Sequence, residues 1–289
     1  MTRFAAAALA FAAVCCRAAE FQVSSEPKRL VNGAPWLIRV HTPAPFQSID
    51  GEFLTSKFAF EYDRDAGVWW ALAGLSFDLR PGKYTLKLEA TAIDGRKEAS
   101  EHPVTVFAGA YQISRIQVPQ KYVSPPKAEM ARIQAERDIK TKLFGQPPSP
   151  QRLWTFPFEK PVDATTTSPY GVQRVYNGVR RGVHTGLDFR ALDATPVKAI
   201  NNGKVLLARD MYYEGGFVVL DHGQGLISMY MHLSAFDVKD GDTVQRGQII
   251  ARSGGTGQST GPHLHLGLRW QSALVDPLTI FGFQQPQPK

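Results

Sequence analysis

Apolar and polar residues alternate in short runs over residues 20–110. The clearest run is YTLKLEA, in which Tyr84, Leu86, Leu88 and Ala90 alternate with polar residues. A period of two is typical of a strand with one buried face, and the Pro-Gly and Asp-Gly pairs around this run are turn formers. WLIRV and PVTVFA repeat the pattern. Several short strands at this spacing predict an immunoglobulin-like β-sandwich.

Residues 111–150 predict a linker that contains one helix. Ser124 and Pro125 can supply an N-cap and a first-turn proline, and Gly145 can end a charged helix after Phe144. The proline-rich QPPSP that follows is stiff and places a domain boundary near residue 150.

Short strands return over residues 151–289. Runs such as KVLLA, FVVLD, LISMYMHL and HLHLGLRW are separated by glycine-rich turns, and none carries a long helical stripe. This pattern predicts a second β domain, so that the chain as a whole is mainly β.

Strand parity in HLHLGLRW, residues 263–270, separates leucines from histidines. Leu264, Leu266 and Leu268 fall on one face, and His263 and His265 share the other. Two imidazoles on one strand face can bind a metal ion, or can place a proton carrier beside one. A half-buried strand with two surface histidines is the alternative.

The run LISMYMHL adds a further histidine by the same parity argument. Ser228, Tyr230 and His232 share one face, opposite Ile227, Met229 and Met231, which are expected in the core.

VHTGLD places His184 and Asp188 four residues apart, where an imidazole and a carboxylate can turn to the same side. With one of His263 or His265 they supply three ligands, which leaves a fourth position on zinc for water, as in a hydrolytic site. His232 and the remaining histidine are then free to move protons.

The motifs HxGxD, YxHLS and STGPHLH, in this order, resemble those of the M23 family of zinc endopeptidases, the lysostaphin-type enzymes. The resemblance covers about residues 160–280. It implies one zinc ion per chain, bound by His184, Asp188 and His265, with His232 and His263 acting in catalysis. It also implies peptidoglycan peptides as the substrate and a β-sheet sandwich with a groove above the zinc.

The chain departs from this pattern at Gly267, where many members of the family have an acidic residue. Arg174 resembles a position near the groove, and His222 resembles one that we interpret as a turn or packing residue. The roles of Arg174 and Tyr230 stay open.

The N-terminal sequence and the composition indicate where the protein is located and which classes of partner it can bind. Residues 1–18 predict a secretory signal peptide, and the only cysteines, Cys15 and Cys16, lie in it. The net charge of +7 is diffuse, without a basic stripe, which argues against nucleic acid as a partner. No other apolar run reaches about 18 residues, so no integral membrane segment is expected in the mature chain. We therefore expect export to the periplasm or cell envelope.

The predicted function is a zinc endopeptidase that hydrolyses peptide cross-links of peptidoglycan through a zinc-activated water. The alternative is a non-catalytic scaffold of the same fold that binds and activates another cell-wall hydrolase. A zinc-independent wall-binding module is a third class. All five site residues are present, which favours the enzyme; the sequence does not indicate whether a protein activator exists.

Overall fold

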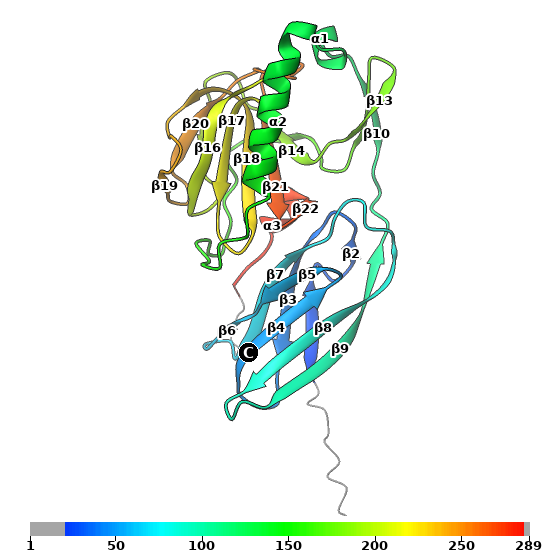
Figure 1. Ribbon diagram of the computed structural model, residues 1–289, viewed down its shortest axis with the longest axis vertical. Coiled ribbons are helices and arrows are strands. Elements are labelled where there is room, and N and C mark those ends of the chain that lie inside the picture. The colour runs from blue at the N-terminus through cyan, green and yellow to red at the C-terminus, as the bar shows by residue number, and fades with distance from the viewer. Residues whose placement is uncertain (1–20, 286–289) are drawn as a thin grey trace, which may run out of the picture.

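The computed structural model describes residues 21–285, apart from the side chains of residues 179–181. The predicted signal peptide, residues 1–18, lies outside the described residues. Within them the chain is mainly β, as predicted, and has two β-rich parts with a helix alongside the second (Figure 1). No helix in this described range is long and apolar enough to cross a membrane.

The N-terminal part is a β-sandwich of two sheets. One sheet has the antiparallel order β1-β3-β7-β6, and the other has the order β2-β9-β8-β4-β5, in which only the β2–β9 pair is parallel. The strands are β1 (Gln22–Glu26), β2 (Leu30–Val31), β3 (Pro35–His41), β4 (Phe46–Phe53), β5 (Ser56–Ala59), β6 (Glu61–Asp63), β7 (Val68–Gly74), β8 (Gly82–Ala92) and β9 (Lys97–Phe107).

The predicted alternation determines which side chains fill this sandwich. Leu86, Leu88 and Ala90 of β8 are buried, as expected from their parity. Trp36 of β3 meets Phe53 of β4 edge to face, with ring centroids 5.3 Å apart, which joins the two sheets.

The segment between the two parts contributes more structure than one helix. It forms β10 (Ile113–Ile116), α1 (Gln120–Val123), a 3₁₀ turn η1 (Lys127–Glu129) and α2 (Met130–Phe144). The helix ends before Gly145, as predicted, but it begins later than the predicted start at Ser124. Pro126 is the reason, because its extended backbone (φ −58°, ψ 147°) stops a helix from running through it.

The second part is built on a ten-stranded, antiparallel sheet. Its main path is β11-β14-β21-β18-β17-β16-β19, with β15, β20 and β22 paired beside it. The strands are β11 (Thr166–Ser168), β14 (Gly186–Phe189), β15 (Pro196–Lys198), β16 (Gly203–Met211), β17 (Gly215–Asp221), β18 (Leu226–Phe236), β19 (Thr243–Val244), β20 (Ile249–Ser253), β21 (Leu264–Trp270) and β22 (Ala273–Val275), followed by α3 (Pro277–Ile280).

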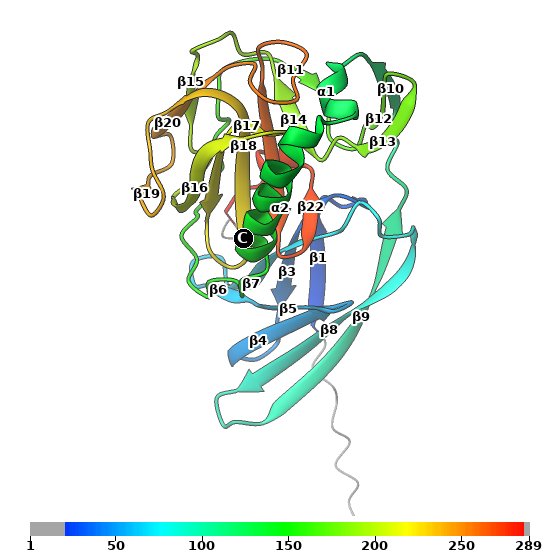
Figure 2. The same ribbon diagram turned by 45° about the horizontal axis from the view of Figure 1, so that its top comes forward.

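A small sheet of three strands, β10-β12-β13, flanks this larger one (Figure 2). Strands β12 (Gln173–Tyr176) and β13 (Val179–Val183) are antiparallel neighbours, and β10 pairs with β12 in parallel. A strand that precedes α2 in the chain is therefore part of the structure beside the second β region.

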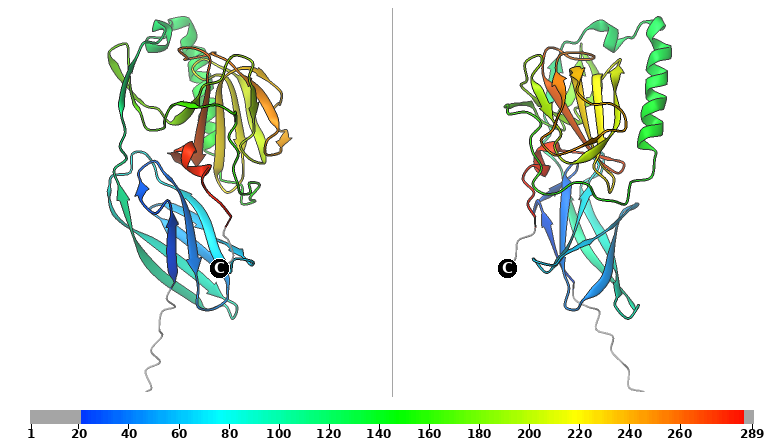
Figure 3. Two further views of the ribbon diagram at one scale, coloured as in Figure 1. Left: turned by 180° about the vertical axis from the view of Figure 1, so that it is seen from behind. Right: turned by 90° about the vertical axis from the view of Figure 1, so that its left-hand side faces the viewer.

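Helix α2 lies along one face of the large sheet (Figure 3, right). Glu136, which is buried, accepts a hydrogen bond from the backbone N–H of Tyr212 at 2.8 Å and from Arg132 Nε at 2.7 Å. Arg132 also pairs with Asp210 at the end of β16. These contacts fix the helix on the sheet.

The two β regions share an apolar contact. Trp70 of β7 packs on Trp154, with ring centroids 5.5 Å apart, and Phe58 of β5 packs on Trp270 at 5.7 Å. Trp69 and Trp70 are both buried. An ion pair between Arg152 and Glu61, 2.8 Å long, borders the apolar contact.

Candidate metal centre

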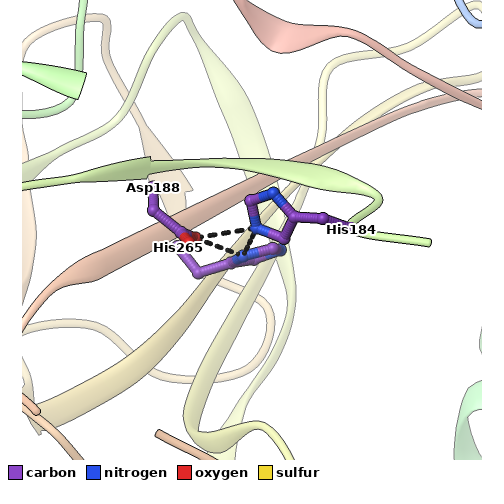
Figure 4. A group of neighbouring side chains, drawn as sticks. All are labelled: His184, Asp188 and His265. Atoms are coloured by element: carbon purple, nitrogen blue, oxygen red, sulfur yellow. Dashed lines mark hydrogen bonds and ion pairs between the residues drawn. The ribbon is translucent and has the colours of Figure 1, made fainter. Parts of the chain in front are cut away.

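Two neighbouring strands position the candidate metal centre. Asp188 of β14 lies directly opposite His265 of β21 in the antiparallel register, so their side chains share a face. His184 precedes β14, and its backbone N–H donates to the carbonyl of Val172 at 2.7 Å. The sheet and this backbone pairing bring the three side chains together (Figure 4).

The three side chains converge on one point. Asp188 Oδ1 lies 2.9 Å from His184 Nε2 and 2.8 Å from His265 Nδ1, and the two nitrogens are 3.0 Å apart. All three residues are buried. His184, Asp188 and His265 are therefore one cluster of metal-ligating atoms.

Gly186 makes room for this cluster. A Cβ at that position would lie 2.3 Å from Nε2 of His265, far inside van der Waals contact. The glycine of the HxGxD motif is thus required by the ring of the histidine on the next strand, and any side chain there would displace that ring.

Backbone and arginine contacts orient two of the three side chains. His184 Nδ1–H donates to the carbonyl of Pro169 at 2.8 Å, which leaves Nε2 facing the cluster. Arg174 Nη2 donates to Asp188 Oδ2 at 3.1 Å and to Ser168 Oγ at 2.8 Å. Arg174 therefore holds the outer carboxylate oxygen and leaves Oδ1 to the cluster.

The donor set fits a metal ion. Because the carbonyl of Pro169 can only accept, Nδ1 of His184 carries the hydrogen, and Nε2 of the neutral ring presents a lone pair. That lone pair lies 2.9 Å from a carboxylate oxygen of Asp188, which is also an acceptor. Two acceptors at this separation repel unless a cation lies between them. Imidazole nitrogens with one carboxylate are typical zinc ligands.

His232 and His263 lie beside the cluster, and the Nδ1 atom of each ring is held by a backbone carbonyl. His232 Nδ1–H donates to the carbonyl of Thr256 at 2.8 Å, and His263 Nδ1–H donates to that of Gly261 at 2.8 Å. Their ring centroids are 4.7 Å apart, and Nε2 of His263 is 3.9 Å from Oδ1 of Asp188. Each ring therefore keeps Nε2 as a free base next to the cluster.

Burial and charge set the protonation states. Burial tends to raise the pKa of Asp188, but its close contacts with His184 and His265 outweigh burial and hold that pKa well below its usual range. Burial, with repulsion from His265 and His263, lowers the pKa of His232 to about 3. At neutral pH the site thus combines a carboxylate with a neutral His232, which can accept a proton.

The expected faces of β18 are inverted: Ser228 and Tyr230 point into the core, and Ile227, Met229 and Met231 lie on the other face. Tyr230 is fully buried in the core, where its hydroxyl accepts the N–H of Ile200 at 2.9 Å, whereas Met231 lines the groove beside the cluster. Met231 lies directly opposite His265 in the strand pairing, so Met231, and not Tyr230, shares the face of the metal cluster. His232 nevertheless reaches the site, because its backbone adopts a left-handed conformation (φ 65°) at a break in the pairing of β18.

Packing explains two further positions. A Cβ at Gly267 would lie 2.9 Å from Cε of Met229, so the methionine occupies the space next to this glycine. His222 is fully buried, with Nδ1 2.7 Å from the carbonyl of Asn202 and Nε2 2.7 Å from Ser228 Oγ, as a packing residue would be.

The cluster opens into a groove of about 810 Å³. One wall comes from the small sheet, through Ser114 and Ile116 of β10 and Tyr176 of β12. Glu214 lines the groove as well, pairs with Lys140 of α2, and accepts the N–H of His232 through its backbone carbonyl at 2.8 Å. The sequence did not predict these wall residues, because the parallel pairing of β10 with β12 joins segments far apart in the chain.

Known proteins resemble the second β region in sequence. The model of peptidase family M23 matches residues 182–277. The peptidoglycan DD-endopeptidase ShyA of Vibrio cholerae is 41% identical over 108 residues, which are 36% of this chain and 25% of that protein. Lysostaphin of Staphylococcus simulans is 47% identical over 121 residues, 41% of this chain and 24% of that protein. The matches thus span about a quarter of these relatives.

A solved structure resembles the chain over most of its length. It is the crystal structure of a Pseudomonas aeruginosa protein assigned to peptidase M23, with a TM-score of 0.66 and 29% identity. The likeness covers 88% of this chain and 96% of that one, so it includes the N-terminal β region as well. Residues 182–277 therefore form a domain of peptidase family M23.

Proposed function

We propose that this protein is a zinc-dependent endopeptidase that cleaves peptide cross-links of peptidoglycan outside the cytoplasm. The observation that carries the proposal is the convergence of His184, Asp188 and His265 on one point, with Nε2 of His263 3.9 Å from Asp188 Oδ1 and the ring of His232 beside those of His263 and His265. The name of one relative, a peptidoglycan DD-endopeptidase, supports peptidoglycan as the substrate.

His184, Asp188 and His265 would hold one zinc ion. When bound, zinc supplies a Lewis acid that polarises a peptide carbonyl and makes water more acidic. His263 and His232 can accept a proton at Nε2, because their Nδ1–H groups are fixed on backbone carbonyls. Once protonated, either imidazolium can stabilise a developing oxyanion or protonate the leaving amine. Arg174 keeps Asp188 aimed at the metal position.

A non-catalytic scaffold of the same fold is the second candidate. Such a scaffold needs neither the proton carriers nor their orientation, yet both rings here have defined Nδ1 partners. Zinc binding alone does not separate the two candidates, whereas hydrolysis does. We therefore favour the enzyme, and propose that the chain acts in the periplasm or cell envelope because that is where its substrate lies.

The experiment combines metal analysis with hydrolysis of a defined cross-linked peptide. The wild-type protein should contain one zinc per chain and cleave the peptide, and Asp188→Ala should lose both properties. Asp193→Ala is the matched control, because Asp193 is an exposed carboxylate on the loop that follows the same strand. Full zinc occupancy in Asp188→Ala would remove Asp188 from the ligand set, and a wild-type protein that binds zinc without hydrolysis would favour the scaffold.

A further inference from the structure

A second hollow lies between helix α2 and the large sheet, apart from the candidate metal centre. It has a volume of about 720 Å³ and shares no lining residue with the groove above the metal cluster. Its volume is within the range of small-molecule sites in proteins. Figure 3 (right) shows α2 along the sheet face that forms the other wall.

The walls of this hollow are largely apolar. Ile139 and Leu143 of α2 face Leu206 of β16 and Ile227 of β18, and these side chains are only partly buried. Partly buried aliphatic side chains on both walls leave apolar surface in contact with water, which a ligand with an apolar body would cover.

One charged side chain in the wall has no hydrogen-bond or ion-pair partner within residues 21–285 as described. Arg269 of β21 has a buried Nε atom without a hydrogen-bond partner, and its side chain forms no hydrogen bond or ion pair with any residue in the described range. Its guanidinium lies 4.9 Å above the ring of Phe144. Burial lowers the pKa of Arg269, and no carboxylate compensates for the loss of water.

The acidic side chain in the wall has one carboxylate oxygen engaged elsewhere. Asp221 of β17 also lines the hollow, but its Oδ1 accepts the backbone N–H of Gly223 at 2.8 Å. Lys142 of α2 adds a second positive charge to the wall. Arg269 is half-buried and has no counter-ion, so its guanidinium has lost part of its hydration, and an anion delivered by a ligand offsets that cost through charge-assisted hydrogen bonds.

We propose that this hollow binds a small amphipathic anion, with its carboxylate or sulfonate on Arg269 and its apolar body between α2 and the sheet. Such a ligand would contact α2, the sheet, Pro147 and the β4–β5 turn at Thr55, and so would hold the helix on the sheet. Lys140, whose partner Glu214 lines the metal groove, belongs to the same helix.

A matched pair of fluorescent probes tests the proposal in the full mature chain. Anilinonaphthalene sulfonate has the required apolar body and anionic group, whereas N-phenylnaphthylamine has the same aromatic body without the charge. The sulfonate should bind at one site per chain, with a Kd at least about tenfold lower than that of the neutral probe, because one charge-assisted hydrogen bond accounts for such a factor.

Two variants locate the site. Arg269→Met should weaken sulfonate binding at least about tenfold and leave the neutral probe unchanged, and it should fold because it removes a half-buried, unpaired charge. Leu143→Trp should fill the apolar part and weaken both probes. Arg64→Met, a change at an exposed arginine of the N-terminal sandwich, controls for the loss of one positive charge. Unchanged sulfonate binding in Arg269→Met, or equal affinity of the two probes for the wild-type protein, would overturn the proposal.

Discussion

His263 and His265 are two residues apart in the chain, but their ring nitrogens have different partners. His265 places Nδ1 2.8 Å from Asp188 within the metal cluster, while His263 uses Nδ1 to donate to the carbonyl of Gly261. We expect His265→Ala to lose zinc. His263→Ala should keep zinc and lose turnover by about 10²–10⁴-fold, the usual effect of a general acid–base group. Metal analysis and rates on one cross-linked peptide compare them, and exchanged phenotypes would reverse the assignment.

Tyr230→Phe tests the buried position of the tyrosine hydroxyl. The hydroxyl accepts the N–H of Ile200 and lies 3.1 Å from Ser228 Oγ. Its removal leaves a buried N–H without a partner, which should lower the free energy of unfolding by about 1–3 kcal/mol. Turnover at a temperature where the variant is folded should equal that of the wild type. A tenfold slower rate with unchanged stability would contradict the placement of Tyr230 in the core.

The sequence predicted the imidazole pair well and Tyr230 poorly, for one physical reason. Parity is reliable where a strand is regular, and the leucines of β21 are buried as predicted. In β18 both faces are covered, one by the core and one in part by α2, so an apolar residue does not identify the core face. The positive φ of His232 then breaks the alternation. A single sequence does not reveal that irregularity.

At the level of elements, the turn between β17 and β18 contains a titratable group, His222, that should make stability depend on pH. Burial lowers the pKa of His222 from 6.5 to about 4. Between these values the unfolded chain binds more protons, so the contribution of His222 to stability is present above pH 6.5 and is lost as the pH falls toward 4.

His222→Gln removes this titration. Urea unfolding from about pH 7 to pH 4 should give a shallower loss of stability for the variant than for the wild type, with a difference of up to about 1.4 kcal/mol per pH unit. The comparison uses slopes, so a constant destabilisation of the variant does not affect it. Equal slopes would show that His222 is not buried as a neutral ring.

Short sequence patterns predicted the end of the helix and most strands of the second β region. They did not predict which strands pair when the strands are far apart in the chain. Gly145 ends α2 as expected from its C-terminal position. The pairing of β10 with β12 depends on a parallel match between residues about sixty positions apart, and short, weakly apolar strands leave no signal of their partners. The linker prediction therefore missed a strand beside the groove.

At the scale of the whole molecule, the N-terminal sandwich is attached to the second β region by aromatic packing and an ion pair. Trp70 and Trp154 form the centre of this contact, and Arg152 stacks over the ring of Trp70 at 4.9 Å while it pairs with Glu61. None of the residues that line the groove above the metal cluster belongs to the sandwich. We expect the sandwich to fix the position of the second region, with the groove open to substrate.

The most direct test of the proposed activity is the incubation of purified sacculi with the mature protein, followed by mass analysis of the muropeptides. We predict that cross-linked dimers decrease and monomers of the corresponding peptide masses increase, and that a chelator stops this change and zinc restores it. His263→Ala, which should retain zinc, serves as the matched inactive control. An unchanged dimer content with the zinc-loaded wild-type protein would contradict the account.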